Sequence, residues 1–93
     1  MKLEGQTALI TGGCSGLGLA TAKLLITKGM KVVIADQNAK QGKSIVEELG
    51  AEKVHYIELD VTRDDEVREA IEAAVQHFGN IRVFVNCAGI IHA

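Results

Sequence analysis

Four glycines lie within seven positions of one short stretch, "TGGCSGLG", which spans residues 11–18. Glycine loses more conformational freedom on folding than any other residue, so this concentration indicates a backbone that something approaches closely. The stretch follows an apolar run and precedes a helical pattern, and the amino end of a helix offers unpaired N–H groups to an anion. The residues therefore predict a phosphate-binding turn, with a purely structural strand-to-helix turn as the alternative.

Spacing separates the chemistries that use glycine at such a turn. A P-loop requires a lysine after its last glycine, whereas Leu19 follows Gly18. The nucleophile elbow G-x-S-x-G fails because Gly16 directly follows Ser15. A G-x-G-x-x-G pattern that starts at Gly16 would end at Thr21, so that match is incomplete. The spacing does not support phosphoryl transfer or a serine nucleophile at this turn.

A carboxylate follows at a distance that suits a nucleotide. Asp36 ends the second apolar run, 18 residues beyond Gly18. This is close to the spacing at which an acidic side chain accepts hydrogen bonds from an adenosine ribose. A carboxylate at that place would repel a 2′-phosphate, which favours NAD over NADP. The alternative is a solvated carboxylate at the end of a strand.

The elements that must position these residues alternate along the whole chain. Strands are predicted at residues 7–11, 31–36, 54–59 and 82–87. Helices are predicted at about 16–28 and 39–49, with a third that starts near Thr62 and ends at Phe78. This alternation predicts an α/β fold, a partial Rossmann-like doubly wound parallel sheet with helices on both faces. With the strand order 3-2-1-4, the fourth strand forms a bare apolar edge.

The helical patterns also predict the buried faces. In the first helix the side chains spaced for one face are Leu17, Ala20, Leu24 and Leu25. In the second helix they are Ile45, Val46 and Leu49. In the third they are Val67, Ile71, Ala74, Val75 and Phe78. Thr62 followed by Asp65 predicts a start that resembles a capping box for the third helix.

Composition narrows the class of protein. The chain has 93 residues, of which 47% are hydrophobic, and a formal net charge of -2, as expected of one globular domain. The sequence has no basic stripe of the kind that binds nucleic acid or an anionic membrane. No apolar run approaches the ~20 residues that span a bilayer. Two cysteines are too few for a disulfide scaffold. We therefore expect an intracellular protein, cytoplasmic or mitochondrial, with a small-molecule partner and reduced thiols.

Three stretches in order resemble one family. The pattern Thr11-Gly12-x-x-x-Gly16-x-Gly18 is similar to the cofactor signature of the short-chain dehydrogenases/reductases. "LDVT" at 59–62 and "NCAG" at 86–89 resemble two further elements of that family. The resemblance covers Gly5 to Ile90 and implies that residues 1–93 are the N-terminal dinucleotide-binding half of such a domain. It implies NAD as the cofactor, bound by Gly12, Cys14, Ser15, Gly16, Leu17, Gly18, Asp36, Gln37, Asp60, Val61, Asn86, Ala88 and Gly89.

The resemblance also implies roles for the later residues. Asp60 and Val61 would contact the adenine, and Asn86 would brace the carboxyl edge of the sheet by hydrogen bonding. Ala88 and Gly89 would leave space for a cofactor ribose.

Two positions bear on the choice of nucleotide. Ser15 and Gln37 stand where NADP-preferring members often carry a basic residue, which again favours NAD. Cys87 departs from the family's N-N-A-G element, in which the second place is asparagine.

The catalytic groups of the family are not identifiable. Members use a serine and a Tyr-x-x-x-Lys pair, but the only tyrosine is Tyr56, with Asp60 four positions later. Tyr56 lies in a predicted strand, where packing is the expected role. The three histidines, His55, His77 and His92, are on separate elements without metal-ligand spacing. The chain alone is therefore expected to be inactive.

Three functions follow. In the first, the chain is part of an oxidoreductase that transfers hydride between NAD and a secondary alcohol or ketone. "ITGGCSGLGLAT" with "NCAGI" resembles the type 2 3-hydroxyacyl-CoA dehydrogenases, which implies a 3-hydroxyacyl-CoA or a hydroxysteroid as substrate. In the second, the chain binds NAD without turnover. In the third, it is an interaction module that pairs, or self-associates, through its exposed fourth strand.

Overall fold

A computed structural model describes residues 3–60 and 63–87 of the chain. Within these ranges strands and helices alternate: β1 (Thr7–Thr11), α1 (Gly16–Thr27), β2 (Lys31–Asp36), α2 (Ala39–Leu49), β3 (Val54–Glu58), α3 (Asp64–Phe78) and β4 (Ile81–Asn86). The type and order of each element match the sequence prediction, and no boundary differs by more than two residues. No helix in the described part is long and apolar enough to cross a membrane.

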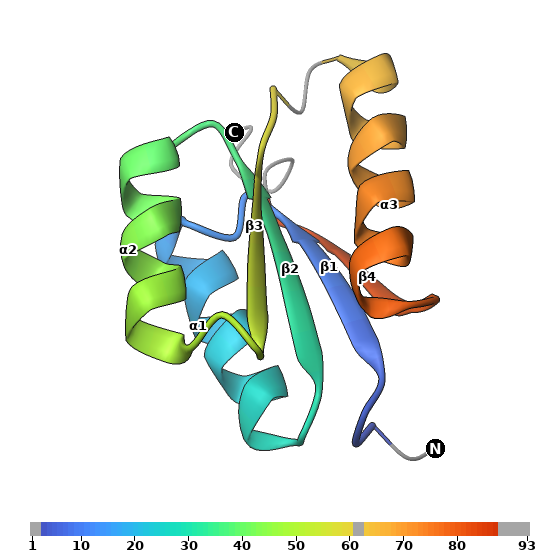
Figure 1. Ribbon diagram of the computed structural model, residues 1–93. Coiled ribbons are helices and arrows are strands. Elements are labelled where there is room, and N and C mark those ends of the chain that lie inside the picture. Colours follow the sequence, from blue (N-terminus) through green and yellow to red (C-terminus); the bar gives the residue numbers. More distant parts are fainter. Residues whose placement is uncertain (1–2, 61–62, 88–93) are drawn as a thin grey trace.

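The strands form one parallel sheet in the order β3-β2-β1-β4. Helices α1 and α2 cover one face of this sheet, and α3 covers the other (Figure 1). Right-handed crossovers between parallel strands place a helix on one face or the other according to the direction in which the next strand is added. The predicted Rossmann-like fold is thereby confirmed.

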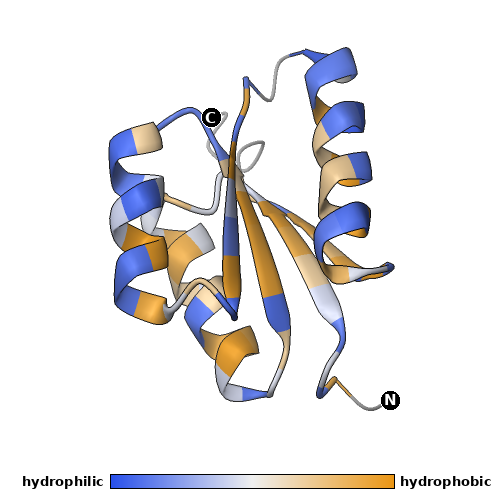
Figure 2. Ribbon diagram, in the orientation of Figure 1, coloured by the Kyte–Doolittle hydropathy of each residue, from blue (hydrophilic) through white to orange (hydrophobic). Residues whose placement is uncertain are grey.

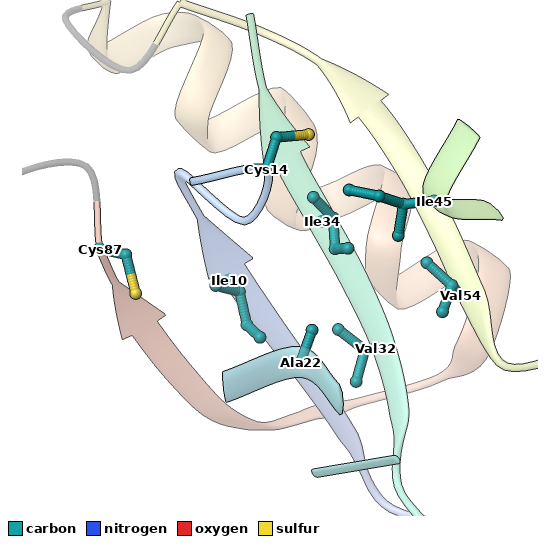
Figure 3. Close-up of a cluster of buried hydrophobic side chains, with 8 residues drawn as sticks. All are labelled: Ile10, Cys14, Ala22, Val32, Ile34, Ile45, Val54 and Cys87. Carbon is teal, nitrogen blue, oxygen red and sulfur yellow. The ribbon is translucent and has the colours of Figure 1, made fainter. Parts of the chain in front are cut away.

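The core has two layers, because successive side chains of a strand point to opposite faces. Figure 2 shows hydrophobic residues concentrated along β1 and β2. The layer under α1 and α2, drawn in Figure 3, consists of Ile10, Cys14, Ala22, Val32, Ile34, Ile45, Val54 and Cys87. The layer under α3 consists of Leu9, Val33, Ala35, Leu59, Ala70 and Ala74. The buried face predicted for α2 is confirmed, because Val46 and Leu49 pack beside Ile45.

Strand β4 forms the predicted edge of the sheet. It pairs with β1 and, within the described residues, with no other strand. Its residues alternate between half-buried and exposed, and the Phe84 side chain is 48% exposed. Phe84 is the register partner of Leu9 and therefore lies on the α3 face of the sheet.

The buried face predicted for α1 is wrong. Leu17 and Leu24 are 56% and 57% exposed and Ala20 is also exposed, whereas Gly18 and Ala22 are buried. A Cβ on Gly18 would lie 2.8 Å from Gly13 Cα and even closer to the Gly12 carbonyl oxygen. The helix is therefore rotated so that this glycine meets the preceding turn. Of the four predicted side chains, only Leu25 packs against the core.

The start of α3 also differs from the prediction. The N-cap is Arg63, which makes no side-chain capping bond, whereas Thr62, on which the predicted capping box depends, lies outside the described residues. Glu66 instead accepts one hydrogen bond from the Asp60 amide at 3.1 Å. It also forms an ion pair with Arg63 Nε at 3.0 Å. The predicted stripe of α3 is mostly confirmed. Ala74 is buried, Val75 is half-buried, and the side chains packed on the core layer are Val67, Ile71 and Phe78.

Candidate functional site

The glycine-rich turn between β1 and α1 is tied to the neighbouring strand. Gly12 has φ 71°, a conformation that glycine adopts without steric cost. Its amide donates to the Ala35 carbonyl at 2.7 Å, and the Ser15 amide donates to the Gly12 carbonyl at 3.1 Å. These bonds hold the turn at the carboxyl end of β1 and β2, the edge at which open parallel sheets bind ligands.

The amino end of α1 offers amides to an anion. Ser15 is the N-cap: its Oγ accepts from the Gly18 amide at 3.1 Å and donates to the Gly12 carbonyl at 2.7 Å. The amides of Gly16 and Leu17 have no partner among the described residues. The first turn of α1 carries no acidic side chain, so no residue of the helix itself compensates the positive end of its dipole.

Gly16 leaves that amino end open. It is exposed, and a Cβ built on it would meet no atom within 4 Å. A phosphate can therefore reach the free amides without displacing a side chain.

The Asp36 carboxylate faces this turn. Its Oδ2 accepts from the Cys14 amide at 3.1 Å, and its Oδ1 accepts from the Asn38 amide at 2.9 Å. A carboxylate has about four acceptor positions, so two remain for hydroxyl groups of a ligand. Next to it lies an open cavity of about 210 Å³, lined by Cys14, Ser15, Asp36, Asn38 and Gln41.

A second cavity adjoins the carboxyl end of β3. It measures about 390 Å³ and is lined by Gln37, Glu58, Leu59, Asp60 and Glu66. The structure thus brings Gln37 and Asp60, from two strand ends, to one hollow. Val61, the other predicted adenine contact, lies outside the described residues.

The junction of β1 and β4 carries the bracing hydrogen bond expected of Asn86. The Thr11 hydroxyl donates to Asn86 Oδ1 at 2.9 Å, and the Cys87 amide donates to the Thr11 carbonyl at 2.9 Å. Ala88 and Gly89, the two predicted ribose neighbours, lie outside the described residues.

The two cysteines are free and buried, as predicted. Burial, and then the Asp36 charge, raise the pKa of the Cys14 thiol to about 11. This thiol is therefore neutral near pH 7 and packs in the core layer rather than acting as a nucleophile.

Sequence reasoning missed two side-chain contacts. The Tyr56 hydroxyl, expected only to pack, donates to the Asp36 carbonyl at 2.6 Å. The imidazoles of His55 and His77 stack with ring centroids 4.0 Å apart, although they lie on β3 and α3. Neither contact has a local sequence signal, because each joins residues at least 20 positions apart. In the described part of the chain, no group of three or more His, Cys, Asp or Glu could hold a metal ion.

The histidine stack predicts that the chain loses stability in mild acid. Burial, and then the His77 charge, lower the pKa of His55 below 6.5. The folded state binds a proton at His55 less well than the unfolded state does. The contribution of neutral His55 to the free energy of unfolding is therefore present above pH 6.5 and is lost as the pH falls below it. We expect the midpoint temperature of thermal unfolding to be lower at pH 5.5 than at pH 7.5.

A His77→Gln variant tests this prediction, because it removes the second charge and keeps a polar side chain. It should show a smaller fall of the thermal midpoint over the same pH range. Lys43 and Glu47, which line the neighbouring cavity with the two histidines, are the same in both proteins. The same pH slope in both proteins would contradict the explanation.

Comparison with known proteins identifies the family. The family model described as short chain dehydrogenase matches residues 6–93, which is most of the chain. The chain belongs to the short-chain dehydrogenase family. This short-chain dehydrogenase segment is 44% identical over 89 residues to momilactone A synthase of Oryza sativa subsp. japonica, covering 96% of the chain and 32% of that protein. It is 45% identical to secoisolariciresinol dehydrogenase of Forsythia intermedia, with the same coverage.

A solved short-chain dehydrogenase structure has the same arrangement. The 3-ketoacyl-(acyl-carrier-protein) reductase of Brucella melitensis, in complex with NADH, superposes with a TM-score of 0.83 and 35% identity. The match covers 88% of this chain and 33% of that one. The chain thus spans about a third of the length of these short-chain dehydrogenase relatives.

Proposed function

We propose that this chain binds NAD through the turn at residues 12–18 and the Asp36 carboxylate. The observation that carries the proposal is the orientation of Asp36, whose carboxylate is held against the turn by the Cys14 amide with two acceptor positions left. The NADH complex of the Brucella melitensis relative supports it.

Each part of the site then has one task. The free amides of Gly16 and Leu17 bind the diphosphate, and the two remaining acceptor positions of Asp36 take the adenosine ribose hydroxyls. The 390 Å³ cavity beside Gln37 and Asp60 takes the adenine. A 2′-phosphate would put a second negative charge against the carboxylate, so NADP is disfavoured.

The full reaction proposed for a protein that contains this segment is hydride transfer between NAD and a secondary alcohol or ketone, such as a 3-hydroxyacyl-CoA or a hydroxysteroid. We infer that residues 1–93 are the N-terminal dinucleotide-binding part of that domain and that this part alone is inactive. The Tyr56 hydroxyl is committed to the Asp36 carbonyl, and burial raises the pKa of Tyr56 to about 12. It is therefore poorly suited to exchange a proton with a substrate near pH 7.

Calorimetric titration of the 93-residue chain tests the proposal. We expect saturable binding of NAD, and binding of NADP that is at least tenfold weaker. A 2′-phosphate would remove a hydrogen bond from a ribose hydroxyl to the Asp36 carboxylate, and a hydrogen bond to a charged group is worth about 1.5–3 kcal/mol. A folded chain that gives no heat and no thermal shift with millimolar NAD would overturn it.

The exposed Phe84 side chain on β4 favours a second candidate, self-association through that strand. Sedimentation of the same samples tests it. A dimer that forms equally with and without NAD is the expected result of this alternative, and a monomer at all concentrations contradicts it.

A further inference from the structure

Tyr56 links β3 to the end of β2. The register pairs Tyr56 with Ile34, so Asp36 lies two residues further along β2 on the same face of the sheet. The tyrosine side chain reaches diagonally to this neighbour and donates its hydroxyl proton to the Asp36 carbonyl at 2.6 Å. The Leu59 amide donates to the same oxygen at 3.2 Å. Two donors from β3 and its end therefore fix the direction of this carbonyl.

The direction of that carbonyl controls the next turn. It sets the plane of the peptide that joins Asp36 to Gln37, and one residue later the Asn38 amide donates back to Asp36 Oδ1 at 2.9 Å. Asn38 is also the N-cap of α2, because its Oδ1 accepts from the Gln41 amide at 3.1 Å. The carbonyl, the turn and the carboxylate thus form one hydrogen-bonded unit.

Helix α2 approaches the tyrosine ring closely. Gly42 is buried in its second turn, and a Cβ there would lie 2.6 Å from Tyr56 Cζ and even closer to two other ring carbons. The Gly42 amide donates to the Asn38 carbonyl at 2.9 Å. Glycine is a poor helix former, so its presence inside α2 is explained by the ring that occupies the space of a side chain. The ring is held between β3 and α2.

We propose that Tyr56 is a positioning residue for the ribose-binding carboxylate of Asp36, acting through the backbone of residues 36–38, and that Gly42 makes room for it. The proposal rests on the NAD site described above. It assigns Tyr56 a share in ribose recognition although its hydroxyl contacts the backbone and not the nucleotide.

The test compares the wild-type chain with Tyr56→Phe, which keeps the ring and removes the hydroxyl. NAD and the NAD analogue that lacks the adenosine 2′-hydroxyl are titrated into each protein. We expect the wild type to bind NAD at least tenfold more tightly than the analogue, and Tyr56→Phe to reduce this ratio to about threefold. A purely structural role of Tyr56 would weaken both ligands equally and leave the ratio unchanged.

Thr27→Val is the matched control. Its hydroxyl also donates to a backbone carbonyl, that of Leu24, at the other end of α1. This variant should keep the wild-type ratio.

Amide hydrogen exchange in the free chain gives a second readout that needs no nucleotide. The amides of Cys14 and Asn38 donate to the Asp36 carboxylate, so we expect their exchange to be about three- to tenfold faster in Tyr56→Phe and unchanged in Thr27→Val. If Tyr56→Phe does not fold, Gly42→Ala provides the same comparison, because its added methyl displaces the ring and should also lower the ratio.

The outcomes separate this proposal from the proposed function. A wild-type chain that does not bind NAD overturns both. A wild-type chain that binds NAD and discriminates against the analogue, with an unchanged ratio in Tyr56→Phe and unchanged exchange at Asn38, overturns the positioning role alone. A lowered ratio together with faster exchange at Cys14 and Asn38 supports it.

Discussion

Gly18→Ala will lower the free energy of unfolding by about 2 kcal/mol. The new methyl group would lie 2.8 Å from Gly13 Cα and closer still to the Gly12 carbonyl, so α1 must move away from the turn. Overpacking costs up to about 3 kcal/mol when, as here, the obstacles are backbone atoms that no rotamer change can move. The better helix propensity of alanine offsets about 1 kcal/mol of that cost. Urea denaturation of the two proteins measures the difference.

Gly16→Ala is the control for this prediction, because it lies one half-turn away in the same helix. Nothing lies within 4 Å of its Cβ position, so the free energy of unfolding should stay within about 1 kcal/mol of the wild-type value. The methyl group would nevertheless occupy the approach of the diphosphate to the Gly16 and Leu17 amides, so NAD affinity should fall. Equal stability losses in the two variants would contradict the packing geometry of α1.

Asp36→Asn will weaken NAD binding by about 10- to 100-fold. It will also remove most of the preference of the chain for NAD over NADP. Hydrogen bonds to a charged group are worth about 1.5–3 kcal/mol, and 1.4 kcal/mol corresponds to a tenfold change in affinity. The amide has one acceptor oxygen, and that oxygen already has the Cys14 or Asn38 amide as a partner. At most one acceptor position of that oxygen is left, so at least one of the two ribose hydroxyls loses its acceptor, while a 2′-phosphate loses a repulsive neighbour.

Titration with both nucleotides measures this change, and Glu52→Gln is the control. Glu52 is exposed in the turn before β3, at the end of the sheet opposite to Asp36, and its replacement removes the same charge. It should leave the ratio of NAD to NADP affinity within about twofold of wild type, because an exposed charge at that distance is largely screened. If Asp36→Asn keeps the wild-type ratio, the carboxylate does not read the ribose.

Much of the fold could be predicted from local pattern. Short apolar runs and glycine-terminated amphipathic stretches specify the element type at each position, and βα alternation leaves a parallel sheet as the arrangement that buries both faces of β1 and β2. The glycine turn was also predictable, since the spacing of Gly12, Gly16 and Gly18 and the place of Asp36 are properties of the chain itself.

The rotation of α1 was decided only by tertiary structure. Apolar periodicity favours burial of Leu17 and Leu24, but the contact between Gly18 and the Gly12–Gly13 turn sets the helix phase instead. Apolar periodicity reflects only residues that have apolar side chains. The phase of α1 is set by Gly18, which has no side chain and therefore packs directly against the backbone of the turn. The exposure of strand β4, by contrast, follows from its predicted place at the edge of the sheet.

Residues close together in the chain specify the order of the elements, the glycine turn and the carboxylate at the end of β2, so these features could be predicted. Only the tertiary structure joined Tyr56 to the Asp36 carbonyl and stacked His55 on His77, over sequence separations of 20 and 22 residues. Such contacts depend on strand register and helix phase, which are set by packing of the whole domain. That is why the glycines of the turn and Asp36 could be named in advance, whereas the residues that hold them in place could not.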